Sequence, residues 1–431
     1  MKHVILGAGP AGIIAAETIR KHAPNDEIVV VGDEPEAPYS RMAIPYLLIG
    51  QVGEEGTRLR HSAGHYSSLR LTLLHNRATG VDTAKRNVVL DDGSLLAFDT
   101  LLIATGSSPA SPPVPGIDGP GVHNCWTLAD ARAIMALAKP GARVLQMGAG
   151  FIGCIIMEAL AARGVQLSVV EMGDRMVPRM MGATAGAMIK DWCQAKGVAV
   201  YTGARVDAIE RPAADSADRV AGAALRVRLS TGQTLDADLV ISATGVRPNI
   251  GWLEDSGIRC LVGVLTDEHL QTNVPGIYAA GDCAEAFDKV SGTTIVSAIQ
   301  PNAAEQARVA ALNMVGQRSA LKGVTQINVL DTLGLISTSF GHWDGLPGGQ
   351  HVELTDRDAS GGGRHLSLQF LGDRLVGCNS VGWTEHVGVM RGLVEGQVRL
   401  GEWKDKLLAD PTQLMPAYLA SAQAQSQPAR G

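Results

Sequence analysis

One glycine-rich pattern occurs twice in the chain, each time between two apolar runs in the order strand, helix, strand. The first copy follows the apolar run 3–7 and continues into a helical stretch at 13–20 and a second apolar run at 28–31. Its loop residues and the acids after its second strand are Gly7, Ala8, Gly9, Pro10, Ala11, Gly12, Asp33 and Glu34. The second copy has strands at 143–147 and 167–170 and a helix that ends at about Arg163. Its matching residues are Gly148, Ala149, Gly150, Phe151, Ile152, Gly153 and Glu171.

Each glycine of the pattern has its own physical role. The first permits a tight turn, the second lets the backbone approach a pyrophosphate, and the third lets the helix pack closely on the strand. The helix N-terminus presents its partial positive charge to the phosphates, and the acid after the second strand accepts hydrogen bonds from an adenosine ribose. One copy would be weak evidence, because glycines also shape ordinary turns. Two complete copies predict two dinucleotide sites.

Further paired signals extend the duplication beyond the loops. The runs 101–106 and 239–245 are apolar strands that both end in Thr-Gly, which adds cofactor-binding candidates at Ala104, Thr105, Gly106 and Gly245. The run 276–283 is a strand that ends at a Gly-Asp corner. Asp282 in that corner can accept a ribityl hydroxyl of a flavin, or it can serve only as a turn residue.

The pattern changes after about residue 320. The runs 365–371 and 374–378 alternate between apolar and polar residues and flank turns such as Gly361–Gly363, which predicts antiparallel strands. A helix is expected from Glu385 to Glu395, and the polar residues 421–431 are typical of a disordered tail.

Composition narrows the class of function. With 45% hydrophobic and 19% charged residues the chain reads as globular, and its net charge of −6 offers no broad basic field, so no nucleic-acid partner is expected. The six cysteines are widely spread without metal or iron–sulfur spacing, so we expect separate thiols in a reducing compartment and no metal site. No apolar run is long enough to span a membrane and no signal-peptide pattern precedes the first strand, which predicts a cytoplasmic protein.

These motifs together resemble the family of FAD-dependent pyridine nucleotide (disulfide) oxidoreductases, over roughly residues 1–400. The resemblance implies an α/β fold with two Rossmann-like dinucleotide-binding domains, one for FAD and one for NAD(P)H, and a C-terminal α+β domain that forms a homodimer interface. The implied divisions are an FAD domain at 1–118 and 243–318, an NAD(P)H domain at 119–242, an interface domain at 319–410 and a flexible tail at 411–431. Among the branches of the family, residues 32–35 followed by 38–41 resemble the ferredoxin, rubredoxin and nitrite reductase flavoproteins.

The resemblance also assigns residues to each cofactor. Around FAD it places Gly7, Gly9, Pro10, Ala11, Gly12, Asp33, Glu34, Arg41, Ala104, Thr105, Gly106 and Asp282. Around the nicotinamide dinucleotide it places Gly148, Gly150, Phe151, Ile152, Gly153, Glu171 and Gly245. NADH is favoured over NADPH, because the Glu171 carboxylate can accept both ribose hydroxyls and would repel a 2′-phosphate. Arg175 weakens this preference, since it can pair with Glu171 or with the pyrophosphate.

Three positions depart from the family pattern. The segment 41–46 has no cysteine beside the flavin, so disulfide and thiol-peroxidase chemistry through this segment is not expected. Tyr46 and Ile155 stand where the ferredoxin-reductase branch has a lysine–glutamate pair, and Gln300 stands where an aromatic residue is expected. Each departure is either functional or family drift without functional consequence.

The resemblance implies an enzyme in which NADH passes a hydride to FAD and electrons continue to a second acceptor, with no catalytic side chain required for the first half-reaction. The acceptor is expected to be a small electron-transfer protein or a partner redox enzyme. The alternatives are a flavoprotein subunit of a larger redox complex and a non-catalytic NADH-binding flavoprotein.

Three other features invite a functional reading that the residues do not support. His386 resembles the base of disulfide reductases but has no thiol to serve, so it is interpreted as a helix-start residue. Cys154 after Gly153 is interpreted as a packing residue, and Met176, Met180 and Met181 as core or loop lining.

Overall fold

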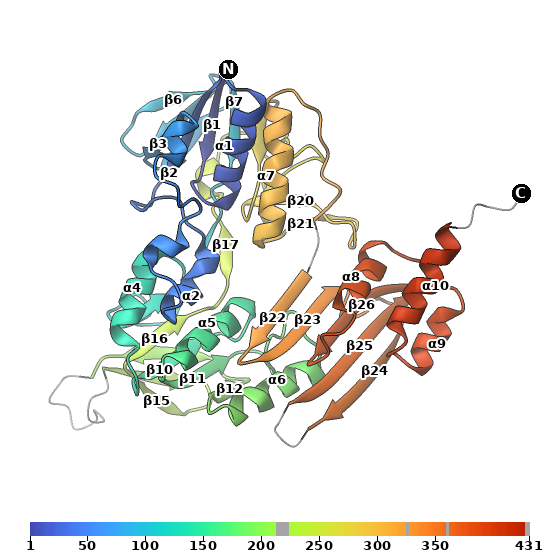
Figure 1. Ribbon diagram of the computed structural model, residues 1–431. Coiled ribbons are helices and arrows are strands. Elements are labelled where there is room, and N and C mark those ends of the chain that lie inside the picture. The colour runs from blue at the N-terminus through green and yellow to red at the C-terminus, as the bar shows by residue number, and fades with distance from the viewer. Residues whose placement is uncertain (213–223, 325–326, 359–361, 427–431) are drawn as a thin grey trace, which may run out of the picture. The chain divides into compact units, whose positions relative to one another are not determined.

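The computed structural model describes residues 1–212, 224–324, 327–358 and 362–426 (Figure 1). The chain forms two compact units, each assembled from separate stretches of sequence. Unit 1 consists of Met1–Ala43, Val52–Ser108 and Val246–Thr325, and unit 2 consists of Ile44–Gln51, Pro109–Gly245 and Gln326–Gly431.

The central sheet of unit 1 is parallel, with the strand order β19-β7-β1-β2-β3. Its strands are β1 (Lys2–Leu6), β2 (Glu27–Gly32), β3 (Leu71–His75), β7 (Thr100–Ile103) and β19 (Ile277–Ala279). Valine, isoleucine and leucine fill the inner strands, as expected for strands that are covered on both faces. The helices α1 (Pro10–His22) and α7 (Gln300–Met314) lie against each other on one face (Figure 1). Ile5 on β1 and Ile13 on α1 belong to the core between them.

The opposite face of this sheet packs on the antiparallel sheet β4-β5-β6, through a core that includes Val4, Val29 and Val88. That sheet consists of β4 (Ala78–Asp82), β5 (Asn87–Leu90) and β6 (Leu95–Ala97). The remaining elements of this part of the chain are η1 (Arg41–Ala43), η2 (Glu54–Thr57), α3 (His65–Ser68), β8 (Ser107–Pro109), β17 (Val246–Pro248), η3 (Gly251–Leu253), β18 (Val264–Leu265), β20 (Ala284–Phe287) and β21 (Thr294–Val296).

Unit 2 contains a second parallel sheet, with the strand order β12-β11-β10-β16-β9. Its strands are β9 (Val122–Asn124), β10 (Arg143–Met147), β11 (Gln166–Glu171), β12 (Ala199–Thr202) and β16 (Leu239–Ser242). The helices are α2 (Ile44–Leu48), α4 (Leu128–Leu137), α5 (Phe151–Ala162) and α6 (Ala183–Ala195), and α2 packs on α4 and α5. An antiparallel sheet adds β13 (Val206–Glu210), β14 (Leu225–Leu229) and β15 (Thr234–Ala237).

The last part of unit 2 is an antiparallel sheet with helices. The strand order is β22-β23-β26-β25-β24. The strands are β22 (Ile327–Thr332), β23 (Leu335–Gly341), β24 (Gln350–Arg357), β25 (Gly363–Leu371) and β26 (Arg374–Val381). The helix α8 (Val387–Glu395) packs on β23 and β26, and α10 (Leu414–Ser426) contacts α8 and α9 (Trp403–Ala409).

The α/β fold class with two Rossmann-like sheets and a C-terminal α+β region is confirmed. The predicted antiparallel pair becomes β25 and β26, and the helix expected from Glu385 begins at Val387. The expectation of a disordered tail from residue 421, and of a flexible tail from 411, was wrong as far as Ser426: the helix α10 buries Leu414, Ala417 and Ser421. The rest of the expected tail, residues 427–431, and Gly361 of the predicted turn lie outside the described residues. The boundaries of the three predicted domains stay predictions.

Candidate functional site

The two glycine loops occupy equivalent places, each between the first strand of its parallel sheet and the following helix. Gly7 has φ +119° and a Cβ there would lie 2.0 Å from the carbonyl oxygen of Ala104. Gly148 has φ +95° and a Cβ there would lie 2.4 Å from the carbonyl oxygen of Ala243. Both the conformation and the close approach therefore require glycine at the first position of each loop.

The second glycine of each loop faces open space. A Cβ on Gly9 or on Gly150 would meet no atom within 4 Å. Neither α1 nor α5, which begin at Pro10 and Phe151, has a side-chain N-cap, so their first N–H groups are open to a ligand. Ala11, Gly12, Ile152 and Gly153 lie in these first turns. Both loops thus fit a pyrophosphate at a helix N-terminus.

The two predicted ribose-binding acids are not at equivalent positions. In both units the last residue of the first strand pairs with a valine, Leu6 with Val31 and Met147 with Val170. The next residue is Gly32 in unit 1 and Glu171 in unit 2. A Cβ at Gly32 would lie 2.8 Å from the Cβ of Ala8, so this position cannot carry an acid. Unit 1 therefore supplies its acids one and two residues later, at Asp33 and Glu34.

Glu171 is tied to the backbone on both sides. Its Oε2 accepts a hydrogen bond of 2.7 Å from the N–H of Ala149, and its Oε1 accepts one of 2.7 Å from the N–H of Gly173. These bonds fix the carboxylate at the edge of the second loop, where an adenosine ribose is expected.

Glu34 has side-chain partners instead. Its Oε1 lies 2.7 Å from Nη2 of Arg41, and its Oε2 accepts a short hydrogen bond from the Tyr39 hydroxyl. Nη1 of Arg41 also donates to the Ser107 carbonyl at 3.4 Å. Asp33 is more exposed and lies 4.0 Å from Arg77. Arg41 therefore links the acid of the first loop to the strand that follows Gly106.

Asp282 lies in the Gly-Asp corner as predicted, next to residues that the sequence did not suggest. Its Oδ2 accepts a hydrogen bond of 2.8 Å from the Ser107 hydroxyl. Burial raises the pKa of Asp282, while Ser107 and Arg41 act in the opposite direction. The N–H of the preceding Gly281 donates to Oε1 of Gln306 on α7 at 2.8 Å. A half-buried carboxylate held in this way fits the role of a hydrogen-bond acceptor for a cofactor hydroxyl.

The two Thr-Gly motifs are held by reciprocal contacts. Thr105 Oγ1 donates to the Asn249 carbonyl at 2.9 Å, and Asn249 Nδ2 donates to the Thr105 carbonyl at 2.9 Å. The N–H of Asn249 donates to the Gly106 carbonyl, and the N–H of Ala110 donates to the Gly245 carbonyl. Ala104 donates to the Leu6 carbonyl, which brings this motif beside the first glycine loop.

Arg175 does not pair with Glu171. Its Nη1 lies 2.8 Å from Asp174, and its Nε donates to the Met181 carbonyl at 2.9 Å. Its guanidinium thus holds the loop after β11 rather than presenting itself to a 2′-phosphate. This arrangement supports the preference for NADH.

The segment expected to hold a redox cysteine forms η1 and the start of α2. Met42 and Tyr46 in it are exposed. Tyr46 on α2 and half-buried Ile155 on α5 lie on helices that pack together, so the lysine–glutamate pair is replaced by uncharged residues. Gln300, which stands where the family has an aromatic residue, accepts a hydrogen bond of 2.8 Å at its Oε1 from the Ser40 hydroxyl.

All six thiols are unsuited to act as nucleophiles. Four of them, Cys154, Cys193, Cys283 and Cys378, are buried. Burial raises the pKa of every cysteine, to about 12 for Cys125 and Cys193. A thiolate is the reactive species, so thiol chemistry is disfavoured near neutral pH.

The other features have structural roles. His386 is the N-cap residue of α8, as predicted, and Met176 and Met181 are buried. Cys154 packs in the first turn of α5, 3.8 Å from the Ala149 carbonyl. Within the described residues, no cluster of three or more His, Cys, Asp or Glu is arranged to hold a metal ion, and no helix has the length and apolar character to cross a membrane.

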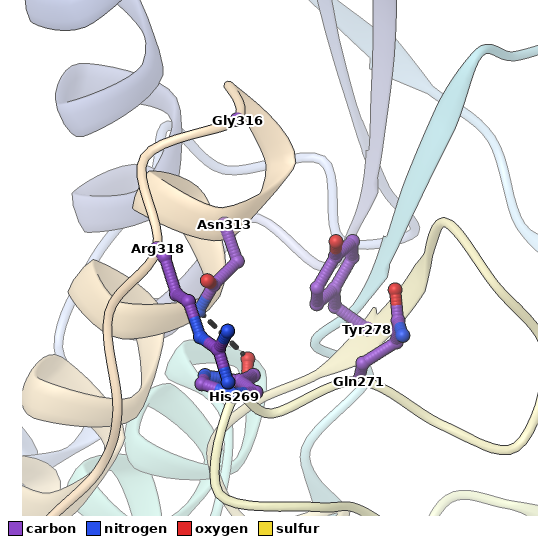
Figure 2. A pocket seen from close by; sticks show the side chains of 6 residues that line it. All are labelled: His269, Gln271, Tyr278, Asn313, Gly316 and Arg318. Carbon is purple, nitrogen blue, oxygen red and sulfur yellow. Dashed lines mark hydrogen bonds between the residues drawn. The ribbon is translucent and has the colours of Figure 1, made fainter.

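A small open pocket of about 260 Å³ lies at the C-terminal end of α7, apart from every predicted cofactor residue. Figure 2 shows Arg318 and Asn313 on one side of it and Tyr278 and Gln271 on the other. Asn313 Nδ2 donates to the carbonyls of His269 and Ser319, which ties the two loops around the pocket together.

Comparisons with known proteins identify the family. The model of the pyridine nucleotide-disulphide oxidoreductase family matches residues 1–311. The epsilon subunit of the NADH-dependent phenylglyoxylate dehydrogenase of Aromatoleum evansii is 31% identical over 95% of both chains. An NADH oxidase of Methanocaldococcus jannaschii is 30% identical over 89% of this chain and 88% of its own. A solved ferredoxin reductase of Rhodopseudomonas palustris has 25% identity and a TM-score of 0.82, covering 97% of this chain and 99% of that one.

These findings confirm the resemblance predicted from the motifs, including the likeness to ferredoxin reductases. They also confirm the pair of cofactors, FAD and NADH, that the two loops predict. The chain belongs to the pyridine nucleotide-disulphide oxidoreductase family and is an FAD-dependent NAD(P)H oxidoreductase.

Proposed function

We propose that this chain is the reductase component of a redox system, taking electrons from NADH through FAD and passing them to a protein acceptor. The acceptor is a small electron-transfer protein or a partner redox subunit. The observation that carries the proposal is the presence of two complete dinucleotide-binding loops, in a chain whose thiols are all disfavoured as thiolates. We call the loop at residues 7–12, with the start of α1, the first cradle, and the loop at residues 148–153, with the start of α5, the second cradle.

The names of the relatives support a protein acceptor. One relative aligned along 95% of its length is a subunit of an NADH-dependent dehydrogenase, which implies electron exchange within an assembly. Others are ferredoxin reductase components of dioxygenase systems. An NADH oxidase also occurs among the relatives, so dioxygen is the second candidate acceptor.

The roles of the residues follow from their contacts. In the first cradle, Gly9 and the N-terminus of α1 would hold the FAD pyrophosphate, with Glu34 at the ribose and Asp282 at the ribityl chain. In the second, Gly150 and the N-terminus of α5 would hold the NADH pyrophosphate, with Glu171 at the ribose. When bound, FAD supplies hydride acceptance from NADH and release of electrons to the acceptor. The protein supplies orientation, and no side-chain base is needed at the nicotinamide.

The test is an acceptor panel with the purified FAD-loaded protein and NADH under anaerobic conditions, followed by a parallel run in air. We expect a reduced iron–sulfur carrier such as a ferredoxin to accumulate at least tenfold faster than dioxygen or a disulfide is consumed. Faster consumption of dioxygen than of every protein acceptor would establish an oxidase instead. A flavin that NADH never reduces would leave only the non-catalytic alternative.

The homodimer and the cytoplasmic location are part of the same proposal. Exposed apolar side chains occur on the C-terminal region at Val329, Ile336, Tyr418 and Leu419, which supports a contact surface there. Light scattering coupled to gel filtration should give twice the chain mass of 45.1 kDa. A mass of one chain at micromolar concentration would refute the dimer. The six free cysteines support a reducing compartment.

A further inference from the structure

The second glycine loop is held by three hydrogen bonds that converge on two of its residues. Gln146 Nε2 donates to the Gly148 carbonyl at 2.8 Å. Glu171 Oε2 accepts from the N–H of Ala149 at 2.7 Å. The N–H of Val177 donates to the Ala149 carbonyl at 2.9 Å. Both polar groups of Ala149 and the carbonyl of Gly148 are thus bound to other groups of the chain itself.

The first loop serves as an internal comparison, because it has the same fold. The residue of β1 that corresponds to Gln146 is Ile5, whose side chain cannot donate a hydrogen bond. Gly32 stands where Glu171 stands, so no carboxylate reaches the first loop from that position. The glutamine and the glutamate are therefore additions to the second cradle rather than requirements of the βαβ fold.

Two of the residues that hold the second loop, Gln146 and Val177, disfavour the folded state locally. Gln146 is fully buried, and its Oε1 has no hydrogen-bond partner among the described residues. Its Nε2 fills the space beside the third glycine, where a Cβ on Gly153 would lie 2.9 Å away. Val177 is buried with φ +50°, a conformation that is strained for a β-branched residue. An unpartnered buried amide oxygen and a strained backbone both oppose folding.

We propose that Gln146 is a positioning residue for the nicotinamide dinucleotide. It fixes the carbonyl of Gly148 so that the N–H groups after Gly150 point at the pyrophosphate. It acts together with Glu171 and Val177, which hold Ala149. A cradle ordered in advance binds its ligand without the entropic loss of ordering the loop. The proposal concerns the nucleotide and holds whichever acceptor the enzyme uses.

The test separates positioning from folding, because the affinity for the nucleotide is expected to fall while the stability of the fold is not. Gln146→Met keeps the size of the side chain and removes both the donor and the unpartnered oxygen. We expect the Kd for NAD⁺, measured by calorimetry because NAD⁺ leaves oxidised flavin oxidised, to rise about fivefold to tenfold. The Tm should stay equal or rise by about 2 °C. Deuterium exchange in the nucleotide-free protein should become faster at residues 147–153 and stay unchanged at residues 6–12.

Leu145→Met is the matched control. Leu145 neighbours Gln146 on β10 and belongs to a core cluster with Met147 and Val240. It should leave the Kd, the Tm and the exchange of residues 147–153 unchanged. If Gln146→Met does not fold, Gln146→Ile, which copies the first cradle, replaces it with the same expectations. An unchanged NAD⁺ affinity, or a loss of affinity together with a lower Tm and global exchange, would overturn the proposal.

Discussion

At the scale of single residues, the Glu171 carboxylate holds the second loop and is proposed to bind the nucleotide ribose as well. The Glu171 carboxylate accepts the N–H groups of Ala149 and Gly173, and it stands where the nucleotide ribose is expected. Replacing it with a residue that cannot accept hydrogen bonds therefore loosens the loop and removes the ribose acceptor together.

We predict that Glu171→Ala raises the Kd for NADH about tenfold, because a partly buried charged acceptor is lost. The Kd for NADPH should rise less, since the repulsion of its 2′-phosphate disappears at the same time. Anaerobic stopped-flow reduction of the flavin at a series of nucleotide concentrations measures both values. Unchanged NADH affinity would show that the second glycine loop does not bind the nicotinamide dinucleotide.

His3 is the residue from which a pH effect on stability is expected. It is buried on β1, 2.7 Å from Thr100 Oγ1 and 2.9 Å from Asp26, which also pairs with the N-terminal amine. Burial lowers its pKa below 6.5 despite Asp26, so the unfolded chain binds the proton more readily than the folded one. Its contribution to stability is complete above the unfolded pKa and is lost as the pH falls through the lower folded value.

We predict that the free energy of unfolding falls below pH 6.5 with a slope of at most about 1.4 kcal/mol per pH unit from this group. His3→Gln should lower stability at pH 8 and flatten the acid side of the profile. Urea unfolding at pH 8, 7, 6 and 5 gives both profiles. Parallel profiles for the two proteins would exclude His3 as the source of the acid sensitivity.

At the scale of elements, the repeated strand–loop–helix units could be predicted from the sequence. The roles of single residues that depend on contacts in three dimensions could not. The glycine pattern placed β1, α1, β10 and α5 correctly, since the turn, the helix start and the apolar strand are all local. The inequivalence of Glu34 and Glu171 depends on strand register and on the space beside Ala8. The proposed role of Gln146 depends on its contact with the Gly148 carbonyl, although an amide between the apolar residues Leu145 and Met147 was a visible signal.

The helix α10 shows how tertiary burial overrides composition. Its alanine, glutamine and serine residues resemble a disordered tail, yet Leu414 and Ala417 are buried and α10 packs on α8. We predict that Leu414→Ala destabilises the protein by about 2–4 kcal/mol. The exposed Leu419 on the same helix is the control, and Leu419→Ala should change stability by less than about 0.5 kcal/mol. Equal, small effects on urea unfolding would mean that the helix does not belong to the core.

The helices α2 and α5 carry Tyr46 and Ile155 at the two positions where ferredoxin reductases are expected to have a lysine–glutamate pair. We predict that Tyr46→Lys together with Ile155→Glu speeds flavin reduction by NADH or raises the flavin potential, because a cation near the ring stabilises its reduced anionic form. Each single change should do worse than the double, since one charge would remain unpaired, with a coupling on the order of 1 kcal/mol. A double-mutant cycle measures it. Strict additivity would show that the two positions do not face each other.

At the scale of the whole molecule, the same βαβ unit occurs twice, and the two copies differ in the contacts that hold their glycine loops and acids. The first cradle joins its acid to Arg41 and Tyr39, whereas the second fixes its loop through backbone groups of Ala149. All six cysteines have a raised pKa, and four of them are buried, which leaves electron transfer between cofactors as the chemistry that the chain supports.

The most direct test is an anaerobic titration of the purified, FAD-loaded protein with NADH, followed by absorbance. One FAD per chain should bleach with one equivalent of NADH, and no long-wavelength band from a thiolate beside oxidised flavin should appear at any point. Replacing Cys125 and Cys260, the two cysteines that are not buried, with serine should leave the rate within about threefold. Appearance of the thiolate band, or a requirement for two equivalents of NADH per flavin, would contradict the account and show that a disulfide takes part in turnover.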